Sequence, residues 1–220
     1  MFKTYIKVYD QNDLLGKRKN ILKRIKFINT YSPNIPSFAD TLIYEMDNHF
    51  IYEQEWVYKK SIRDYHKNFL IQKLEQLAGD LDRMSALGYV HGDLNRKNIL
   101  FNGNYFKIID LEPSLEQIEH NKKKFMFTIP YWSLNDMDRK EITTETDKIG
   151  FLAFCNWVIN KNFFIKNSLE KFRERFKNRI ELFSIDEADL IKMNFNDLIH
   201  TRMKNENWNF ERRLLDFEVK

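Results

Sequence analysis

Three oxygen-bearing side chains interrupt apolar segments in the middle of the chain. Asp93 and Asn98 lie five residues apart in YVHGDLNRKNILF, residues 89–101, and Asp110 ends the stretch FKIID. Carboxylate and amide oxygens are ligands that Mg²⁺ prefers, with water and substrate phosphate completing its shell. One carboxylate can instead accept a proton from an attacking hydroxyl. These residue types predict a magnesium site beside a general base, with ordinary turn residues as the alternative.

The hydrophobic pattern predicts elements that bring these side chains together. Short strands near residues 98–101 and 105–110 flank the loop Asn102-Gly103-Asn104, and such a hairpin would gather the three groups. Periodicity and turn residues predict the other elements. The expected strands are 2–9, 38–46 and 49–57, and the expected helices are 13–30 with Asp13 as N-cap, 61–87, 144–160, 166–183 and 186–200.

This order of elements predicts an α+β chain. A small β-rich part, residues 1–57, would precede a larger helical part, residues 58–220. The predicted helix 61–87 carries leucines at helical spacing, which should face the core: Leu70, Leu74, Leu77 and Leu81.

Composition and charge leave several kinds of partner open. The chain has 220 residues, 43% of them hydrophobic, which argues against a disordered protein. The net charge of +4 permits a phosphate ligand, nucleic acid or an anionic membrane surface and selects none of them. Nucleic-acid binding would rest on charge alone, so we do not expect it.

The sequence suggests a cytoplasmic protein. The single Cys155 cannot form an internal disulfide and fits a core residue. No signal peptide is visible, and no stretch approaches the roughly 20 apolar residues of a membrane span. Basic residues of the first helix, among them Lys23 and Arg24, are compatible with a peripheral membrane contact or with a solvated face.

The polar stretch resembles a known catalytic loop. HGDLNRKN is similar to H-x-D-L-x-x-x-N of protein-kinase-like enzymes, and IIDLE is similar to the metal-binding D-F-G that follows it. TIPYWSLND, residues 128–136, resembles the end of an activation segment. Asp147 falls where the family has a helix aspartate that braces the catalytic loop. The resemblance covers roughly residues 2–160 and implies a protein-kinase-like bilobal fold with a reduced N-lobe.

The resemblance also implies roles for individual residues. Asp93 would be the catalytic base, Asn98 and Asp110 would hold Mg²⁺, and ATP would be the phosphoryl donor. Lys7 would contact the nucleotide phosphates from the first strand. Lys97, inside the loop, could touch a phosphate or be a solvated lysine.

A hinge-like stretch should contribute to the nucleotide site. EQEWVYKKSIRDY, residues 53–65, resembles a kinase hinge, which implies that Glu55 and Val57 contact the nucleotide.

The sequence also departs from the family pattern. No glycine-rich loop precedes the strand of Lys7, and the following helix has no acid to pair with that lysine; Glu112 is a candidate substitute. Gly92 replaces the arginine of regulated kinases, so we expect no switch by phosphorylation. Asn95 stands where Ser/Thr kinases often carry lysine. HGDLN is similar to atypical bacterial kinases, including lipopolysaccharide-core sugar kinases.

Three functions follow from these features. The first is a kinase for protein Ser/Thr, which the resemblance of residues 128–136 favours. The second is a kinase for a glycan such as a lipopolysaccharide core sugar. The third is a pseudokinase that binds partners without chemistry. A partner subunit that covers the phosphates is compatible with each of them.

Overall fold

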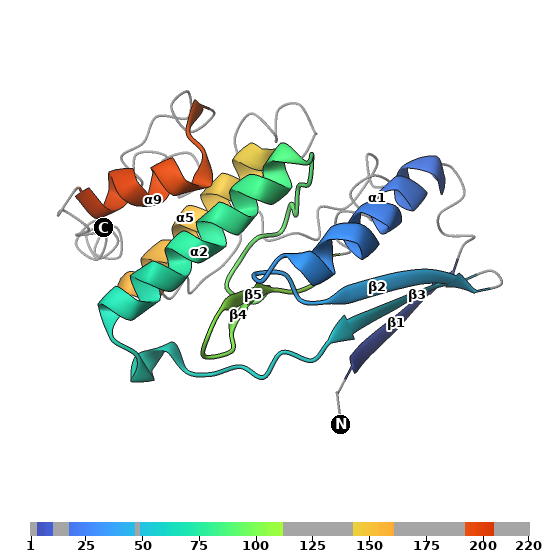
Figure 1. The fold of residues 1–220 in the computed structure, drawn as a ribbon, viewed down its shortest axis with the longest axis horizontal. Helices are drawn as coiled ribbons and strands as arrows, with labels where there is room; N and C mark the ends of the chain where they lie inside the picture. Colours follow the sequence, from blue (N-terminus) through green and yellow to red (C-terminus); the bar gives the residue numbers. More distant parts are fainter. Residues whose placement is uncertain (1–3, 11–17, 47–48, 112–142, 161–191, 205–220) are drawn as a thin grey trace, which may run out of the picture.

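The structure, a computed structural model, describes residues 4–10, 18–46, 49–111, 143–160 and 192–204 (Figure 1). These residues form helices and two small antiparallel sheets, so the predicted α+β class is confirmed. The strands are β1 (Thr4–Asp10), β2 (Thr41–Met46), β3 (His49–Glu55), β4 (Ile99–Phe101) and β5 (Phe106–Ile108). The helices are α1 (Arg18–Tyr31), α2 (Lys67–Ala86), α5 (Thr144–Asn160) and α9 (Phe195–Lys204), with 3₁₀ turns at Ser32–Asn34 and Ile62–Asp64.

The first sheet has the strand order β1-β3-β2, and α1 packs against β2 (Figure 1). Both strand pairs are antiparallel, and their register sets Lys7 of β1 opposite Tyr52 of β3, which in turn lies opposite Ile43 of β2. Ile43 and Tyr52 are buried, as is Ile28 of α1. The sheet therefore buries the face that carries these two side chains.

Side chains from the end of α1 and the turn after it cover the outer edge of β2. Asn29 donates from Nδ2 to the Ile43 carbonyl at 2.6 Å, and its Oδ1 accepts from the Ile43 N–H at 2.7 Å. The Ser32 hydroxyl donates to the Thr41 carbonyl at 2.9 Å and accepts from the Thr41 N–H at 3.1 Å. An edge strand otherwise leaves such groups unpaired. These four bonds fix the helical segment to the sheet.

The predicted strand 38–46 is divided between two sheets, and this part of the prediction is wrong. The Ala39 N–H donates to the Ile108 carbonyl at 2.9 Å, and the Ile108 N–H donates to the Ser37 carbonyl at 2.7 Å. Phe38 is fully buried, with its ring 5.4 Å from that of Tyr89. Burial of Phe38 draws residues 37–39 towards β5, and β2 begins only at Thr41.

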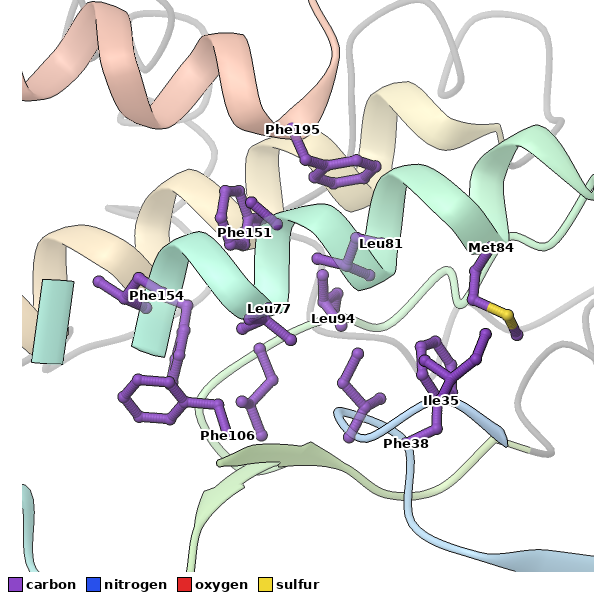
Figure 2. Close-up of a cluster of buried hydrophobic side chains, with 14 of the residues drawn as sticks. Ile35, Phe38, Leu77, Leu81, Met84, Leu94, Phe106, Phe151, Phe154 and Phe195 are labelled. Carbon is purple, nitrogen blue, oxygen red and sulfur yellow. The ribbon is translucent and has the colours of Figure 1, made fainter. Parts of the chain in front are cut away.

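The core fills the space between α2, α5 and the β4–β5 hairpin (Figure 2). The four leucines predicted for α2 are all buried, at 0–3% exposure. Leu94, next to Asp93, is buried among them at 1% exposure and anchors its loop to the core. Cys155 is a buried core residue as predicted, and burial raises the pKa of its thiol well above the usual range.

The predicted helix 61–87 begins later than expected. Residues 62–64 form a separate 3₁₀ turn, because the Ser61 hydroxyl caps it by accepting from the Arg63 N–H at 3.2 Å, and α2 starts at Lys67. The predicted helix 186–200 is interrupted at residues 193–194, and its residues 186–191 lie outside the described part of the chain. After the interruption α9 starts at Phe195, where the Asp82 carboxylate accepts from the Phe195 N–H at 2.7 Å and the Asn196 N–H at 3.1 Å. An acid at a helix N-terminus stabilises that end.

Other predictions are confirmed or stay untested. The bounds of α5 agree with the prediction. The predicted helix 166–183 and the cap at Asp13 lie outside the described residues, and the division at residue 57 stays a prediction. Within the described ranges, no helix is both long enough and apolar enough to cross a membrane.

Candidate active site

The main chain before Asp93 is held by a carboxylate from a helix that lies far away in the sequence. Asp147 of α5 is 3% exposed, and its two oxygens accept from the His91 N–H at 2.6 Å and the Gly92 N–H at 2.7 Å. Gly92 has a φ of 81°, a region that side chains disfavour. The predicted brace by Asp147 is therefore observed, and it fixes the direction in which the chain enters Asp93.

The buried His91 ring connects the loop to the hairpin. The Asp93 N–H lies 3.2 Å from Nδ1, and Nε2 lies 3.0 Å from the Ile109 carbonyl oxygen. Since an N–H only donates and a carbonyl only accepts, Nδ1 is the unprotonated nitrogen and Nε2 carries the hydrogen. His91 thus acts as a structural bridge between the loop and the hairpin.

Two amides hold the carboxylate of Asp93. Asn95 donates from Nδ2 to Oδ1 of Asp93 at 2.9 Å, and Asn98 donates from Nδ2 to Oδ2 at 3.0 Å. Each amide also donates to the Asp93 carbonyl, at 2.9 Å in both cases. Each carboxylate oxygen of Asp93 therefore has its own amide donor, and the rotation of the side chain is restricted from both sides.

The hairpin brings Asp110 towards the same loop. The Ile109 N–H donates to the Asn98 carbonyl at 2.8 Å, while the Ile109 carbonyl is bonded to His91. Asp110 follows at once with a φ of 55°, where few residues other than glycine lie but aspartate is tolerated. Backbone strain of this kind gathers at functional sites. The loop thus fixes the main chain on which Asp110 is carried.

The donor set of Asn98 and Asp110 fits magnesium. Asn98 turns its Nδ2 to Asp93, so its Oδ1 is the atom of the amide that a cation would take. One amide oxygen and one carboxylate suit an ion that keeps water and phosphate oxygens as further ligands. Among the described residues, no cluster of three or more His, Cys, Asp or Glu side chains could hold a metal.

Helix α5 approaches the segment 91–94 very closely one turn after Asp147. A Cβ atom built on Gly150 would lie 2.0 Å from the Leu94 carbonyl oxygen and 3.0 Å from the Leu94 carbonyl carbon. No side chain fits at that distance. Asp147 and Gly150 together hold the two ends of the segment 91–94 against α5.

A tyrosine of the first sheet reaches the segment after Asp110. The Tyr52 hydroxyl accepts from the Leu111 N–H at 3.3 Å and from Gln54 Nε2 at 2.6 Å. Lys7 lies directly opposite Tyr52 in the sheet register. The backbone of the predicted phosphate-binding strand is thus connected through Tyr52 to the chain after Asp110.

The hinge-like residues lie where β3 ends. The Glu55 carboxylate forms an ion pair with Lys107 of β5 at 3.0 Å, and the Glu55 N–H donates to the Asp40 carbonyl at 2.9 Å. Burial, and then the charge of Glu55, raises the pKa of Asp40, while Lys107 lowers it. The Glu55 side chain therefore joins the first sheet to the hairpin. Val57 is half-buried two residues on.

The remaining predicted residues are only partly described. Lys97 is exposed, and its main-chain N–H donates to Asn95 Oδ1 at 2.8 Å. Glu112 and residues 128–136 lie outside the described part of the chain. The structure thus joins Asp93, Asn98 and the backbone of Asp110 through His91 and Ile109, and it leaves the phosphate contacts of Lys7 and Lys97 as predictions.

Three contributors were missed or undervalued from the sequence. Asn95 was noted only as a departure from a family pattern, Gly150 was not singled out, and Tyr52 was one of several strand aromatics. A signal existed for Asn95, because an amide two residues after an acid can bond back to it. Gly150 and Tyr52 act on residues more than 50 positions away, which local spacing does not reveal.

Comparisons with known proteins leave the family open. No protein-family model matches the chain, and no curated protein matches its sequence.

Proposed function

We propose that the chain is an ATP-dependent phosphotransferase of the protein-kinase-like type, with Asp93 as the catalytic base. The observation that carries this proposal is the double amide contact to Asp93, with Asn98 connected through Ile109 to Asp110. One acid is oriented by two side-chain amides, and a second acid follows a hydrogen-bonded hairpin. Phosphoryl transfer uses one acid for the acceptor hydroxyl and another for the metal ion, because its catalysis depends mainly on positioning and charge stabilisation.

In the proposed reaction, Asp93 orients the acceptor hydroxyl and takes its proton on a carboxylate oxygen. The hydroxyl oxygen forms a bond to the γ-phosphorus, and the bond from that phosphorus to the β,γ-bridging oxygen breaks, which releases ADP. Asn98 and Asp110 would hold Mg²⁺ with oxygen ligands. When bound, this ion neutralises negative charge on the β- and γ-phosphates.

The first sheet would supply the nucleotide site. In this proposal Lys7 and Lys97 contact phosphates, and the chain around Glu55 and Val57 contacts the base. Because the Glu55 carboxylate is paired with Lys107 and its N–H is bonded to Asp40, we assign its nucleotide contact to the main-chain carbonyl. The β-rich N-lobe and the helical C-lobe would meet at this segment.

The leading acceptor is a protein Ser/Thr hydroxyl. A glycan such as a lipopolysaccharide core sugar is the second candidate, because Gly92 and Asn95 differ from the regulated protein kinases. The φ of 81° at Gly92 disfavours an arginine at this position, which agrees with the expected lack of a phosphorylation switch. Transfer of labelled phosphate from ATP to protein or to glycan substrates distinguishes these acceptors.

Calorimetric titration with ATP and Mg²⁺ tests the proposal. We expect the wild type to bind Mg-ATP and Asp110→Ala to bind at least about tenfold more weakly, a loss of about 1.4 kcal/mol. Asp64→Ala is the matched control, since Asp64 is an exposed acid on the 3₁₀ turn before α2. A wild type that binds no Mg-ATP would overturn the proposal and favour the pseudokinase alternative. Equal affinities of the wild type and Asp110→Ala would exclude the metal role of Asp110.

A further inference from the structure

Asn95 is a buried amide with every side-chain polar atom in use. The residue is 3% exposed, its Nδ2 donates to the carbonyl and Oδ1 of Asp93, and its Oδ1 accepts from the Lys97 N–H. Rotating the amide by half a turn would bring Nδ2 against the Lys97 donor and Oδ1 against the Asp93 carboxylate. The network therefore fixes the orientation of the Asn95 amide.

The main chain of Asn95 supports the same loop. Its carbonyl accepts from the N–H groups of Asn98 and Ile99, each at 3.0 Å. The turn that returns the chain from Asp93 to β4 is thus centred on Asn95. A substitution that keeps this turn but removes the side-chain amide would isolate the contact to Asp93.

Asn95 and Asn98 contact different oxygens of the same carboxylate. Asn95 bonds Oδ1 and Asn98 bonds Oδ2, and both bond the Asp93 carbonyl. Their second partners differ. The Asn95 amide oxygen is bonded within the loop, whereas the amide oxygen of Asn98 is the proposed metal ligand.

From this difference we infer that Asn95 is a positioning residue for Asp93, an inference that rests on the proposed phosphotransferase function. Asn95 holds the carboxylate in the orientation that meets the acceptor hydroxyl, and it takes no part in holding the nucleotide or the ion. Loss of its amide should lower turnover and leave the affinity for Mg-ATP unchanged. Misplacement of a reacting group by about 1 Å can lower a rate by about a hundredfold.

The test uses steady-state hydrolysis of labelled ATP by the full chain, with water as the acceptor. We expect Asn95→Ala to lower kcat by about 10- to 100-fold, with KM for Mg-ATP within about twofold of the wild type. Asn95→Asp should be slower still, because it replaces a donor by a second negative charge beside Asp93. Asn98→Ala is the matched variant, and it should weaken Mg-ATP binding itself.

A structural readout separates positioning from loss of the fold. In the wild type, the Asn95 side-chain amide protons should exchange with solvent more slowly than those of the exposed Asn104. Thermal unfolding and the calorimetric affinity for Mg-ATP identify Asn95 variants that are folded.

The outcomes distinguish this inference from the proposed function. A wild type that neither binds nor hydrolyses Mg-ATP would overturn both. If the wild type is active, full turnover by a folded Asn95→Ala, or a change in KM alone, overturns the positioning role only. Exchange of the Asn95 amide as fast as that of Asn104 would remove the contact on which the inference depends.

Discussion

The segment 91–94 and the edge of β2 are both held by side chains that bond to main-chain groups, but the bonds from Asp147 and those from α1 span very different lengths of chain. Asn29 and Ser32 reach partners 14 and nine residues away, whereas Asp147 reaches back 55 and 56 residues. Contacts of short span lose less loop-closure entropy when they form. The corner of α1 and β2 therefore depends mainly on local contacts, whereas the main chain at residues 91–92 depends on the docking of α5.

The largest effect should come from Asp147→Ala. The variant leaves the buried N–H groups of His91 and Gly92 without this acceptor, and each such donor costs about 1–3 kcal/mol, so the expected loss of stability is about 2–6 kcal/mol. Chemical denaturation measures it. Asp147→Asn keeps the shape of the side chain but has only one acceptor oxygen. Its stability should therefore lie between those of the wild type and Asp147→Ala. A loss below about 1 kcal/mol for Asp147→Ala would contradict the brace.

The second-largest loss of stability should come from Gly150→Ala, whereas Gly79→Ala should stabilise the protein. The new Cβ at Gly150 meets the Leu94 carbonyl, and we expect a loss of about 1–3 kcal/mol or more together with weaker Mg-ATP binding. At Gly79 in α2 the nearest atom is 3.8 Å away, and alanine should add about 0.5–1 kcal/mol. Unfolding curves of both variants measure these changes in stability. Equal changes of the same sign would contradict the close approach of α5.

The β2 edge should be less sensitive and independent of the site. Asn29→Ala removes two hydrogen bonds to Ile43, with an expected loss of about 1–3 kcal/mol and no change in the Mg-ATP affinity of the folded protein. Asn34→Ala is the control, because that exposed amide donates only to the Thr30 carbonyl among the contacts described for it. A change in nucleotide affinity for Asn29→Ala would show that the two regions are coupled.

The smallest effect should be the pH dependence at Asp40. Burial and Glu55 raise the pKa of Asp40, so the folded chain binds its proton more tightly than the unfolded chain does. The ionised Asp40 therefore destabilises the fold at neutral pH. This destabilisation is relieved as the pH falls through the raised pKa and Asp40 takes up its proton. Asp40→Asn should therefore be no less stable than the wild type at pH 7 and should flatten the profile in the acidic range. Denaturation at several pH values tests it, and a steeper profile for the variant would contradict the assignment.

The sequence predicted the elements of the candidate site better than the bonds within it. The strand-like runs on either side of the loop Asn102-Gly103-Asn104 predicted the hairpin, because strand and turn signals act over a few residues. The brace by Asp147 was expected only through the resemblance to a family. The capping of α9 by Asp82 was not predicted, since it spans 113 residues.

Residues 37–46 show that local sequence patterns do not identify long-range partners. An apolar run identifies buried residues but does not say which sheet buries them. Phe38 pairs with Ile108 of the hairpin and its ring packs on Tyr89, and both partners lie far away in the sequence.

The covered edge of β2 has a consequence for association between molecules. Leu42 and Tyr44 are 52% and 43% exposed, so this strand displays apolar side chains to solvent. An incoming strand would need the N–H and carbonyl groups of Thr41 and Ile43, which Ser32 and Asn29 already occupy. Extension of the sheet at this edge must first break those four bonds. Asn29 and Ser32 therefore protect a hydrophobic edge strand from growing into an intermolecular sheet.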